Sequence, residues 1–254
     1  MISQNLVNRT LNYYQKFSQE SFVVKPSLPV LYFGDLIKFN NSEIKVITVG
    51  KNPSDNEFRI TRADRFSFVR FPKWRSKEEN LVESLNAYFK TIPLKNWFSS
   101  FEPILNGMSC SFYGQKARNI VIHTDICSPI ATFPTWSNLK NEQQENLFNE
   151  GHQIWLELIE ELQPDFILAS IPFALFSKVV KSGGKTIMSF KTKKDGFPRK
   201  KPYDVSLHKY QLKSGKEANV VFGIAANKPF DTITNEQKEE IGNELKKIIN
   251  VSQH

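Results

Sequence analysis

Polar residues that could do chemistry stand directly after four short apolar runs of this sequence. The four segments are GKNPSD at 50–55, HTDICSP at 123–129, SIPFAL at 170–175 and AANKPF at 225–230. They offer side-chain amides, carboxylates and ammonium groups, which can orient water and hydrogen-bond a polar ligand. The metal-binding and nucleophile patterns HExxH, paired CxxC and GxSxG do not occur. The sequence therefore implies no cofactor and no metal.

The apolar pattern predicts the elements that must hold these residues. Short runs rich in β-branched and aliphatic residues, typical of strands buried on both faces, lie at 43–50, 119–129, 164–172 and 218–229. Helical spacing occurs in the first 25 residues, at 81–90 and at 141–162. This alternation predicts an α/β fold, a three-layer α/β/α arrangement with a central four-stranded parallel sheet. Ligands of such sheets bind at the carboxyl ends of the strands, where the polar segments stand.

Composition limits the partners. The chain has 254 residues, a net charge of +8 and a pI near 9.3, so we expect one domain over 1–254 and a polyanionic partner. Ten Lys or Arg residues against two Asp residues mark the segment 185–216 as a basic insert, a hairpin or loop. Cys110 and Cys127 suit reduced, buried thiols. With no signal sequence or membrane span in the pattern, we expect a soluble cytoplasmic monomer.

Three of the strand ends resemble motifs of the uracil-DNA glycosylase superfamily. The stretch VGKNPS resembles the first motif of its mismatch-specific and single-strand-selective branches, and IVIHTDICSPI is similar to the base-recognising strand of the single-strand-selective branch. VVFGIAANKPF resembles the last motif, in which Asn-Pro-Ser or His-Pro-Ser follows a strand. The resemblance spans roughly 44–230 through strand ends rather than continuous similarity. It implies a glycosylase fold that cleaves the N-glycosidic bond of a base flipped out of DNA.

The resemblance gives the first motif a catalytic role. Cleaving an N-glycosidic bond passes through an oxocarbenium-like sugar, so the enzyme must stabilise charge and place a water. By family correspondence Asn52 positions that water, Gly50 allows close backbone approach, and Pro53 stiffens the turn. Lys51 is expected beside them in the base-binding group. An ordinary turn is the alternative, because Asn and Pro are common turn formers.

The same correspondence predicts a pocket for a modified cytosine. Ser54 stands where some uracil-specific relatives carry a bulky aromatic residue. The smaller serine leaves room for a substituent at C5 of the base. Phe66 and Phe68 are candidates for stacking on the extruded base, with core packing as the alternative. Asp125 stands where uracil-removing relatives carry an asparagine. An ionised carboxylate only accepts hydrogen bonds and so suits the N4 amino group of cytosine, unless Asp125 merely caps the following turn. His123 is either a structural residue of the strand, the commoner case for a histidine there, or a catalytic one.

The last motif and the basic segment are predicted to contact DNA. Asn227 would contribute to catalysis from the opposite side of the base or sugar, and Lys228 replaces the small residue or proline usual in the family. Phe230 is either a wedge that fills the space of the flipped nucleotide or a packing residue of the next helix. The segment 185–216 either grips phosphate or is a solvated loop. Its candidate DNA contacts are Lys193, Lys194, Lys200 and Lys201.

The expected function is that of a monofunctional DNA glycosylase. Its best substrate is a C5-modified cytosine, in defence against phage DNA, or else a deaminated or damaged base, in repair. A non-catalytic nucleic-acid binder on the same fold and a small-molecule enzyme on a doubly wound sheet are the alternatives. The stretch SGGKT at 182–186 is not a phosphate-binding P-loop, because Val179 occupies the position of the earlier glycine.

Overall fold

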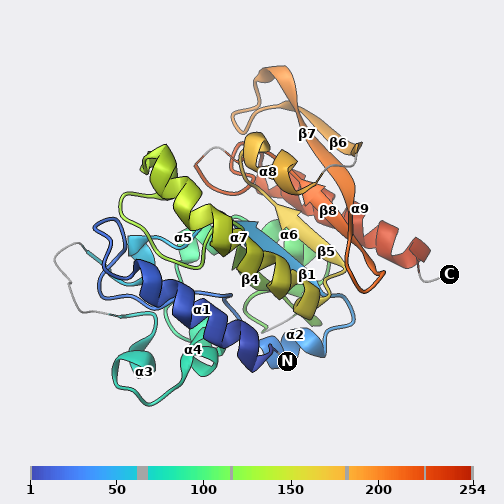
Figure 1. Ribbon diagram of the computed structural model, residues 1–254. Coiled ribbons are helices and arrows are strands. Elements are labelled where there is room, and N and C mark those ends of the chain that lie inside the picture. The colour runs from blue at the N-terminus through green and yellow to red at the C-terminus, as the bar shows by residue number, and fades with distance from the viewer. Residues whose placement is uncertain (1, 62–67, 115–116, 181–182, 226, 253–254) are drawn as a thin grey trace. The chain divides into compact units, whose positions relative to one another are not determined.

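The computed structural model of the chain describes residues 2–61, 68–114, 117–180, 183–225 and 227–252 (Figure 1). The chain forms two compact units, each of which is made of three segments. Unit 1 comprises Met1–Asn40, Val49–Leu94 and Ile122–Gln163. Unit 2 comprises Asn41–Thr48, Lys95–Val121 and Pro164–His254. The strand β1 (Val46–Gly50) begins in unit 2 and ends in unit 1.

Unit 1 consists mainly of helices and the strand β4 (Ile122–Asp125). Its α-helices are α1 (Gln4–Phe17), α2 (Leu36–Asn40), α3 (Pro72–Arg75), α4 (Leu81–Ala87) and α7 (Asn141–Leu162). Short 3-10 helices are η1 (Asp55–Glu57), η2 (Tyr88–Lys90) and η3 (Trp136–Asn138). Helix α1 begins where the Ser3 side chain accepts a hydrogen bond from the Leu6 N–H, because this cap satisfies one of the free donors at the helix start.

Helix α7 supports the end of strand β4. It has the bounds that the helical spacing predicts, and its apolar stripe is buried along its length. The indole of Trp155 donates to Oγ1 of Thr124 at 3.1 Å, and Nδ1 of His152 lies 3.1 Å from the carbonyl of Ile126. These contacts fix the segment in which the predicted base-recognising residues stand.

Unit 2 carries the remaining strands. Its strands are β2 (Cys110–Ser111), β3 (Asn119–Ile120), β5 (Phe166–Ala169), β6 (Lys185–Thr192), β7 (Pro198–Gln211) and β8 (Glu217–Phe222). Its helices are α5 (Lys95–Phe98), α6 (Glu102–Gly107), α8 (Phe173–Val179) and α9 (Asn235–Ser252). β2 and β3 form a separate parallel pair.

Among the described residues, six strands form one mixed sheet in the order β4-β1-β5-β8-β7-β6. The four predicted strands are its neighbours β4, β1, β5 and β8. β5 and β8 pair in parallel, with Phe166 opposite Asn219, and β7 runs antiparallel to β8 and to β6. The fold is therefore mixed α/β, and the sheet has two strands more than the predicted four. Both come from the basic segment.

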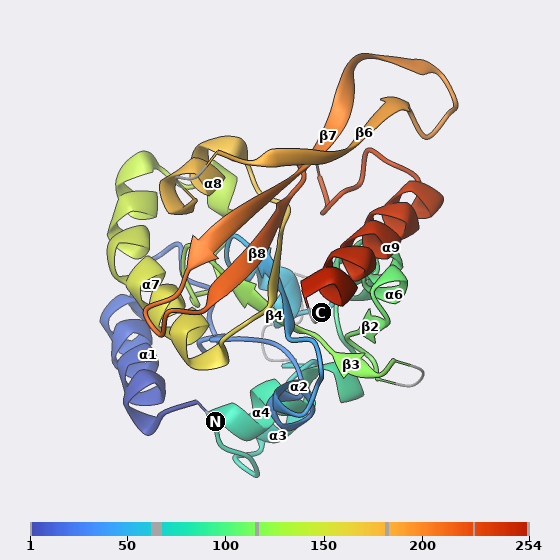
Figure 2. The same cartoon turned by 90° about the vertical axis from the view of Figure 1, so that its right-hand side faces the viewer.

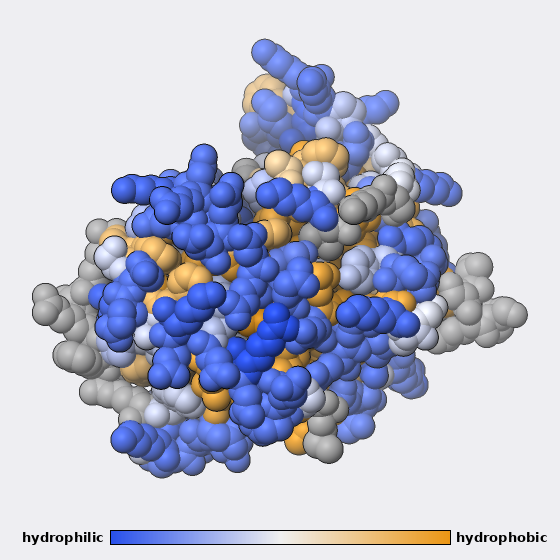
Figure 3. Space-filling model, viewed as in Figure 1, coloured by the Kyte–Doolittle hydropathy of each residue, from blue (hydrophilic) through white to orange (hydrophobic). Residues whose placement is uncertain are grey.

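The basic segment 185–216 forms the hairpin of β6 and β7, one of the two predicted forms. It is joined to the sheet rather than set apart from it, because β7 pairs with β8 from Ser206–Phe222 to Gln211–Glu217. Figure 2 shows the far end of the hairpin projecting from the rest of unit 2. In the space-filling view this end, at the top, is largely hydrophilic (Figure 3).

Both cysteines, Cys110 and Cys127, are free and buried, as the sequence predicts. No helix in the described ranges combines the length and the apolar character that crossing a membrane requires. The same ranges contain no group of three or more His, Cys, Asp and Glu side chains arranged to hold a metal ion.

Candidate functional site

The segments that follow β1 and β4 are bonded to each other within unit 1. The backbone N–H groups of Ile126 and Cys127 donate to the carbonyls of Gly50 and Lys51, at 3.0 and 2.8 Å. Farther along, the N–H of Thr132 donates to the carbonyl of Pro53 at 3.3 Å. The first two predicted motifs therefore form one structural cluster.

Asn52 is held in a defined orientation by this cluster. Its Nδ2 donates to the carbonyl of Ile130 at 3.0 Å and to Oγ1 of Thr132 at 2.9 Å. Both amide hydrogens are thereby used, which leaves Oδ1 as the acceptor; no bond to Oδ1 occurs within the described residues. The side chain is half-buried. An acceptor fixed in this way can orient a water, while the same two contacts also stabilise the turn.

Lys51 and Ser54 flank Asn52 and Pro53. Nζ of Lys51 donates to Oγ of Ser137 at 2.6 Å, and burial lowers the pKa of this lysine. Pro53 is buried, whereas Ser54 is half-buried, and the backbone of Ser54 forms a bridge with the segment after β4. Position 54 carries a small side chain, and a pocket with room for a C5 substituent stays a prediction.

Asp125 and His123 lie against the backbone of Gly50. A Cβ atom at position 50 would stand 2.4 Å from Oδ1 of Asp125 and 2.9 Å from Nε2 of His123, closer than any real side chain allows. Both residues are buried, Asp125 at 7% exposure, and Nε2 of His123 lies 3.6 Å from Oδ1 of Asp125. The lack of a side chain at Gly50 therefore leaves room for a carboxylate and an imidazole, while its role toward a substrate stays a prediction.

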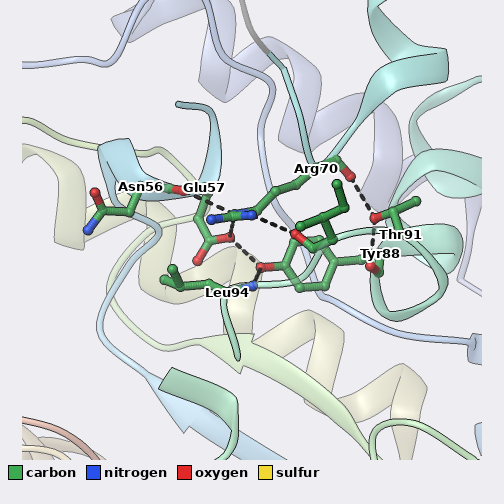
Figure 4. Close-up of polar contacts among 7 residues, drawn as sticks. Asn56, Glu57, Arg70, Tyr88, Thr91 and Leu94 are labelled. Carbon is green, nitrogen blue, oxygen red and sulfur yellow. Dashed lines mark hydrogen bonds and ion pairs between the residues drawn. The ribbon is translucent and has the colours of Figure 1, made fainter. Parts of the chain in front are cut away.

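A second carboxyl group, Glu57, is buried in the same unit (Figure 4). The hydroxyl of Tyr88 donates to Oε2 of Glu57 at 2.5 Å, and Nε of Arg70 lies 3.9 Å from the same oxygen. Arg70 also donates to the carbonyls of Asn56 and Ile92, at 3.1 and 2.6 Å. In Figure 4 the other carboxyl oxygen of Glu57 points away from both Tyr88 and Arg70.

The pKa of Glu57 is raised to about 7, chiefly because burial disfavours the charged carboxylate. The Tyr88 hydrogen bond and the positive charge of Arg70 lower the pKa, and the negative charge of Asp125 raises it. Asp125 is thus close enough for its charge to act on Glu57. Near neutral pH Glu57 is therefore present in both its protonated and its ionised form.

Phe68 belongs to a cluster of aromatic rings rather than to an open stacking surface. It is 7% exposed, and its ring contacts the edge of Phe58 at 5.8 Å between centroids. Phe58 stacks on Phe71 at 5.6 Å, and Phe71 contacts Tyr88 at 5.5 Å. This burial fits the packing alternative for Phe68. Phe66 lies outside the described residues.

Asn227 and Lys228 belong to unit 2, in the loop after β8. Both residues are exposed, and their backbone N–H groups donate to Oδ2 of Asp231 at 3.0 and 3.1 Å. Their side chains are therefore presented to solvent by a loop whose backbone is fixed by a carboxylate.

Phe230, in contrast, is fully buried. Its N–H donates to Oγ of Ser170 at 3.0 Å, and its ring meets Phe101 edge-on at 6.1 Å. A buried ring cannot enter a DNA duplex from this position, so the structure fits the packing alternative and not the wedge.

The four candidate lysines of the hairpin are exposed: Lys193, Lys194, Lys200 and Lys201. In the described part of the chain none of them forms an ion pair. Lys194 and Lys228 both act on the buried Lys238, whose pKa falls to about 8, mainly by desolvation and also by the repulsion of these two charges. The hairpin and the loop after β8 therefore contribute to one electropositive region of unit 2.

A cavity of about 300 Å³ in unit 2 contains none of the predicted site residues. Phe166 and Asn219, near the starts of β5 and β8, line it together with Glu43 and Lys209. It lies at the amino ends of the parallel strands, whereas ligands of such sheets bind at the carboxyl ends. We therefore place the candidate site at the strand ends of unit 1.

Sequence reasoning missed Glu57 and its partners Arg70 and Tyr88. Glu57 stands two residues after the segment GKNPSD, outside the three strand-end motifs. The surrounding residues, DNEFRI at 55–60, form no apolar run, so the local sequence gives no signal that Glu57 is buried.

The chain matches no protein-family model, and no curated protein is detectably similar to it. The resemblance to the uracil-DNA glycosylase superfamily therefore rests on the strand-end motifs, and the candidate site is interpreted from its own geometry.

Proposed function

We propose that this protein is a monofunctional DNA glycosylase that hydrolyses the N-glycosidic bond of a flipped C5-modified cytosine, on a three-layer α/β/α fold of the uracil-DNA glycosylase type. One observation carries the proposal. The buried carboxylate of Asp125 lies against Gly50, in a cluster that is bonded to the loop of Asn52. A carboxylate in the base-recognising position accepts hydrogen bonds and so selects a base that donates them.

The two neighbouring carboxyl groups match the edge of cytosine. Cytosine offers the N4 amino group as a donor and N3 as an acceptor, whereas uracil offers the reverse pattern at O4 and N3. Asp125 in its ionised form accepts from N4. Glu57, whose pKa is about 7, supplies the protonated form that donates to N3. The pair favours cytosine over uracil because a single substrate edge satisfies both groups.

The proposed hydrolysis uses these residues as follows. Oδ1 of Asn52 accepts a hydrogen bond from a water and directs its oxygen toward C1′ of the sugar. The C1′–N1 bond breaks as the oxygen of the water bonds to C1′, and the base leaves with the bonding electron pair. The proton from Glu57 neutralises the departing base, and the proton that the water loses restores Glu57 through solvent.

The setting follows from the substrate. Hypermodified cytosines occur in some phage genomes, so the proposed activity suits defence against foreign DNA, with removal of a damaged base in repair as the other use. The net charge of +8 and the exposed lysines of the β6–β7 hairpin support a DNA partner, because phosphate contacts by Lys and Arg supply most of the non-specific affinity. The half-buried Ser54 supports a substituent at C5.

A non-catalytic DNA binder on the same fold is the second candidate. It is favoured by the two hydrogen bonds of Asn52 Nδ2, which a purely structural asparagine would also make. In this alternative the strand-end cluster binds a modified base without cleaving it.

Alkaline cleavage separates the two candidates. Duplex DNA that contains one 5-hydroxymethylcytosine is incubated with the protein and heated in alkali, which breaks the strand at an abasic site. We expect strand cleavage at the modified position, and none in a duplex with unmodified cytosine. A duplex that is bound, by gel shift, yet stays intact under alkali contradicts the glycosylase and supports the binder.

A further inference from the structure

Phe197 is an exposed aromatic ring at the tip of the β6–β7 hairpin. Its exposed fraction is 66%, the largest of any phenylalanine in the described residues, and the turn before it connects the two strands. Burying a phenylalanine ring stabilises a protein, so an exposed one forgoes that stabilisation. A ring in this position fits a surface that meets another molecule.

The turn holds Phe197 in a fixed position. The N–H of Lys193 donates to the carbonyl of Phe197 at 2.8 Å, and the N–H of Phe197 donates to Oδ1 of Asp195 at 3.1 Å. Gly196 takes a φ of +83°, a conformation that favours glycine, and its N–H donates to the carbonyl of Lys193 at 3.0 Å. Because the backbone is already ordered, contact with a partner costs little additional entropy.

Positive charge stands on both sides of the ring. Lys193 and Lys194 come just before it, and Lys200 and Lys201 come just after it. All four are exposed and form no ion pair in the described chain. The acceptor Oδ1 of the nearest acid, Asp195, is used by the turn itself. In sequence order, the tip therefore carries one exposed apolar ring between two pairs of exposed cations.

We propose that the tip is a wedge for duplex DNA, in which Phe197 inserts between base steps while the two lysine pairs contact the phosphate backbones on either side of a groove. Apolar side chains inserted between base steps unstack and kink a duplex, and phosphates on both edges of a groove match two separated pairs of cations. The wedge, one of the two roles considered for the buried Phe230, is thus proposed for Phe197 instead. The wedge proposal does not depend on glycosylase activity, because it concerns binding to an unmodified duplex.

An anionic membrane is the other partner that a basic, aromatic tip could meet. Stable membrane contact needs a wide apolar face, and here one ring and the neighbouring Pro198 stand among six basic residues between 191 and 201. DNA needs only one ring for one base step, so the tip fits DNA better.

The test uses the full chain, an unmodified duplex with 2-aminopurine at a central step, and the variants Phe197→Ala and Phe197→Trp. Phe173→Ala is the matched control, since Phe173 is 61% exposed on α8 of the same unit. The parent should raise 2-aminopurine fluorescence on binding. Phe197→Ala should lose that rise and bind about 10-fold more weakly with the same salt dependence, because stacking is lost and phosphate contacts remain. Phe197→Trp should keep the rise.

Equal fluorescence and affinity for the parent and Phe197→Ala would overturn the wedge. The wedge would also be overturned if Phe197→Ala kept its duplex affinity but lost binding to phosphatidylserine vesicles. That result would show that Phe197 contacts a lipid surface. Failure of the wedge leaves the proposed glycosylase intact, because no base release is measured here. Absence of base release in the alkaline assay likewise leaves the wedge in place.

Discussion

The hydroxyl of Tyr88 donates a 2.5 Å hydrogen bond to Oε2 of Glu57 inside unit 1. The same hydroxyl accepts from the N–H of Leu94 at 3.0 Å, so it joins the carboxyl group to a loop (Figure 4). Arg70 approaches the same carboxyl oxygen. Glu57 is therefore a buried group with two stabilising partners and a raised pKa, which makes its protonation state a measurable property of the fold.

Glu57 should make stability fall as pH rises. Its pKa is about 7 in the folded protein against 4.5 for an ordinary glutamate, so the folded state binds a proton more tightly than the unfolded state. This contribution is complete below pH 4.5 and is lost as pH rises through 7, by roughly 3 kcal/mol. Urea unfolding of the parent and of Glu57→Gln from pH 5 to 8 measures it. The difference in free energy of unfolding between the parent and Glu57→Gln should change with pH, because only the parent loses this contribution as pH rises. A constant difference from pH 5 to 8 would contradict the raised pKa.

Asn52→Ala should lower base release at least about 100-fold and leave DNA binding within several-fold of the parent, because the amide positions water rather than phosphate. Thr132→Val is the matched control. It removes one acceptor of the Asn52 amide but keeps the amide and its bond to Ile130. Single-turnover rates and thermal melts are measured for both variants. Similar rate losses in the two would show that Asn52 only stabilises the turn, and retained activity in Asn52→Ala would remove it from the mechanism.

Gly50→Ala should displace Asp125, since the new methyl group would stand 2.4 Å from its Oδ1. We expect a loss of stability of about 1–3 kcal/mol, typical of overpacking a buried site, together with loss of base preference. Gly183→Ala, in open space, is the control and should change neither. Chemical denaturation and competition between modified and unmodified duplexes give the two quantities. A Gly50→Ala protein with the parent's stability and preference would refute the close packing at this site.

Replacing Lys193, Lys194, Lys200 and Lys201 together by Gln should weaken duplex binding and flatten its dependence on salt. Each lost phosphate contact lowers the slope of log affinity against log salt by about 0.9, so four contacts lower it by up to about 4. The control carries the same change of charge at exposed lysines outside the hairpin: Lys25, Lys38, Lys77 and Lys95. Affinities from 50 to 200 mM salt are compared. Equal slopes for the two quadruple variants would make the hairpin a bystander.

The sequence predicted the elements whose signal is local. The apolar runs at 43–50 and 164–172 became β1 and β5, and helix α7 has its predicted bounds because its apolar residues repeat at helical spacing over 22 residues. The meeting of the Gly50 and Asp125 segments was also predictable, since the polar residues follow neighbouring strands. Whether Asn52 acts on water stays a prediction.

Features that depend on tertiary packing were not predictable in the same way. The charged strands β6 and β7 lack an apolar run, and their place in the sheet depends on pairing with β8. Phe230 is buried because Phe101, distant in sequence, covers it. Glu57 turns inward in a 3-10 helix, and no residue near it in the sequence indicates that the Tyr88 hydroxyl donates a hydrogen bond to it.

The most direct test of the account is mass spectrometry of the bases released from genomic DNAs that differ in cytosine modification, by the parent and by Asp125→Asn. The parent should release a C5-modified cytosine and no uracil from uracil-containing DNA. Asp125→Asn is nearly isosteric; it should lose that release and gain some on uracil, whose O4 accepts from the new amide. A thermal melt confirms that the variant is folded. A folded Asp125→Asn protein with the parent's base preference, or a parent that releases only uracil, would contradict the central claim.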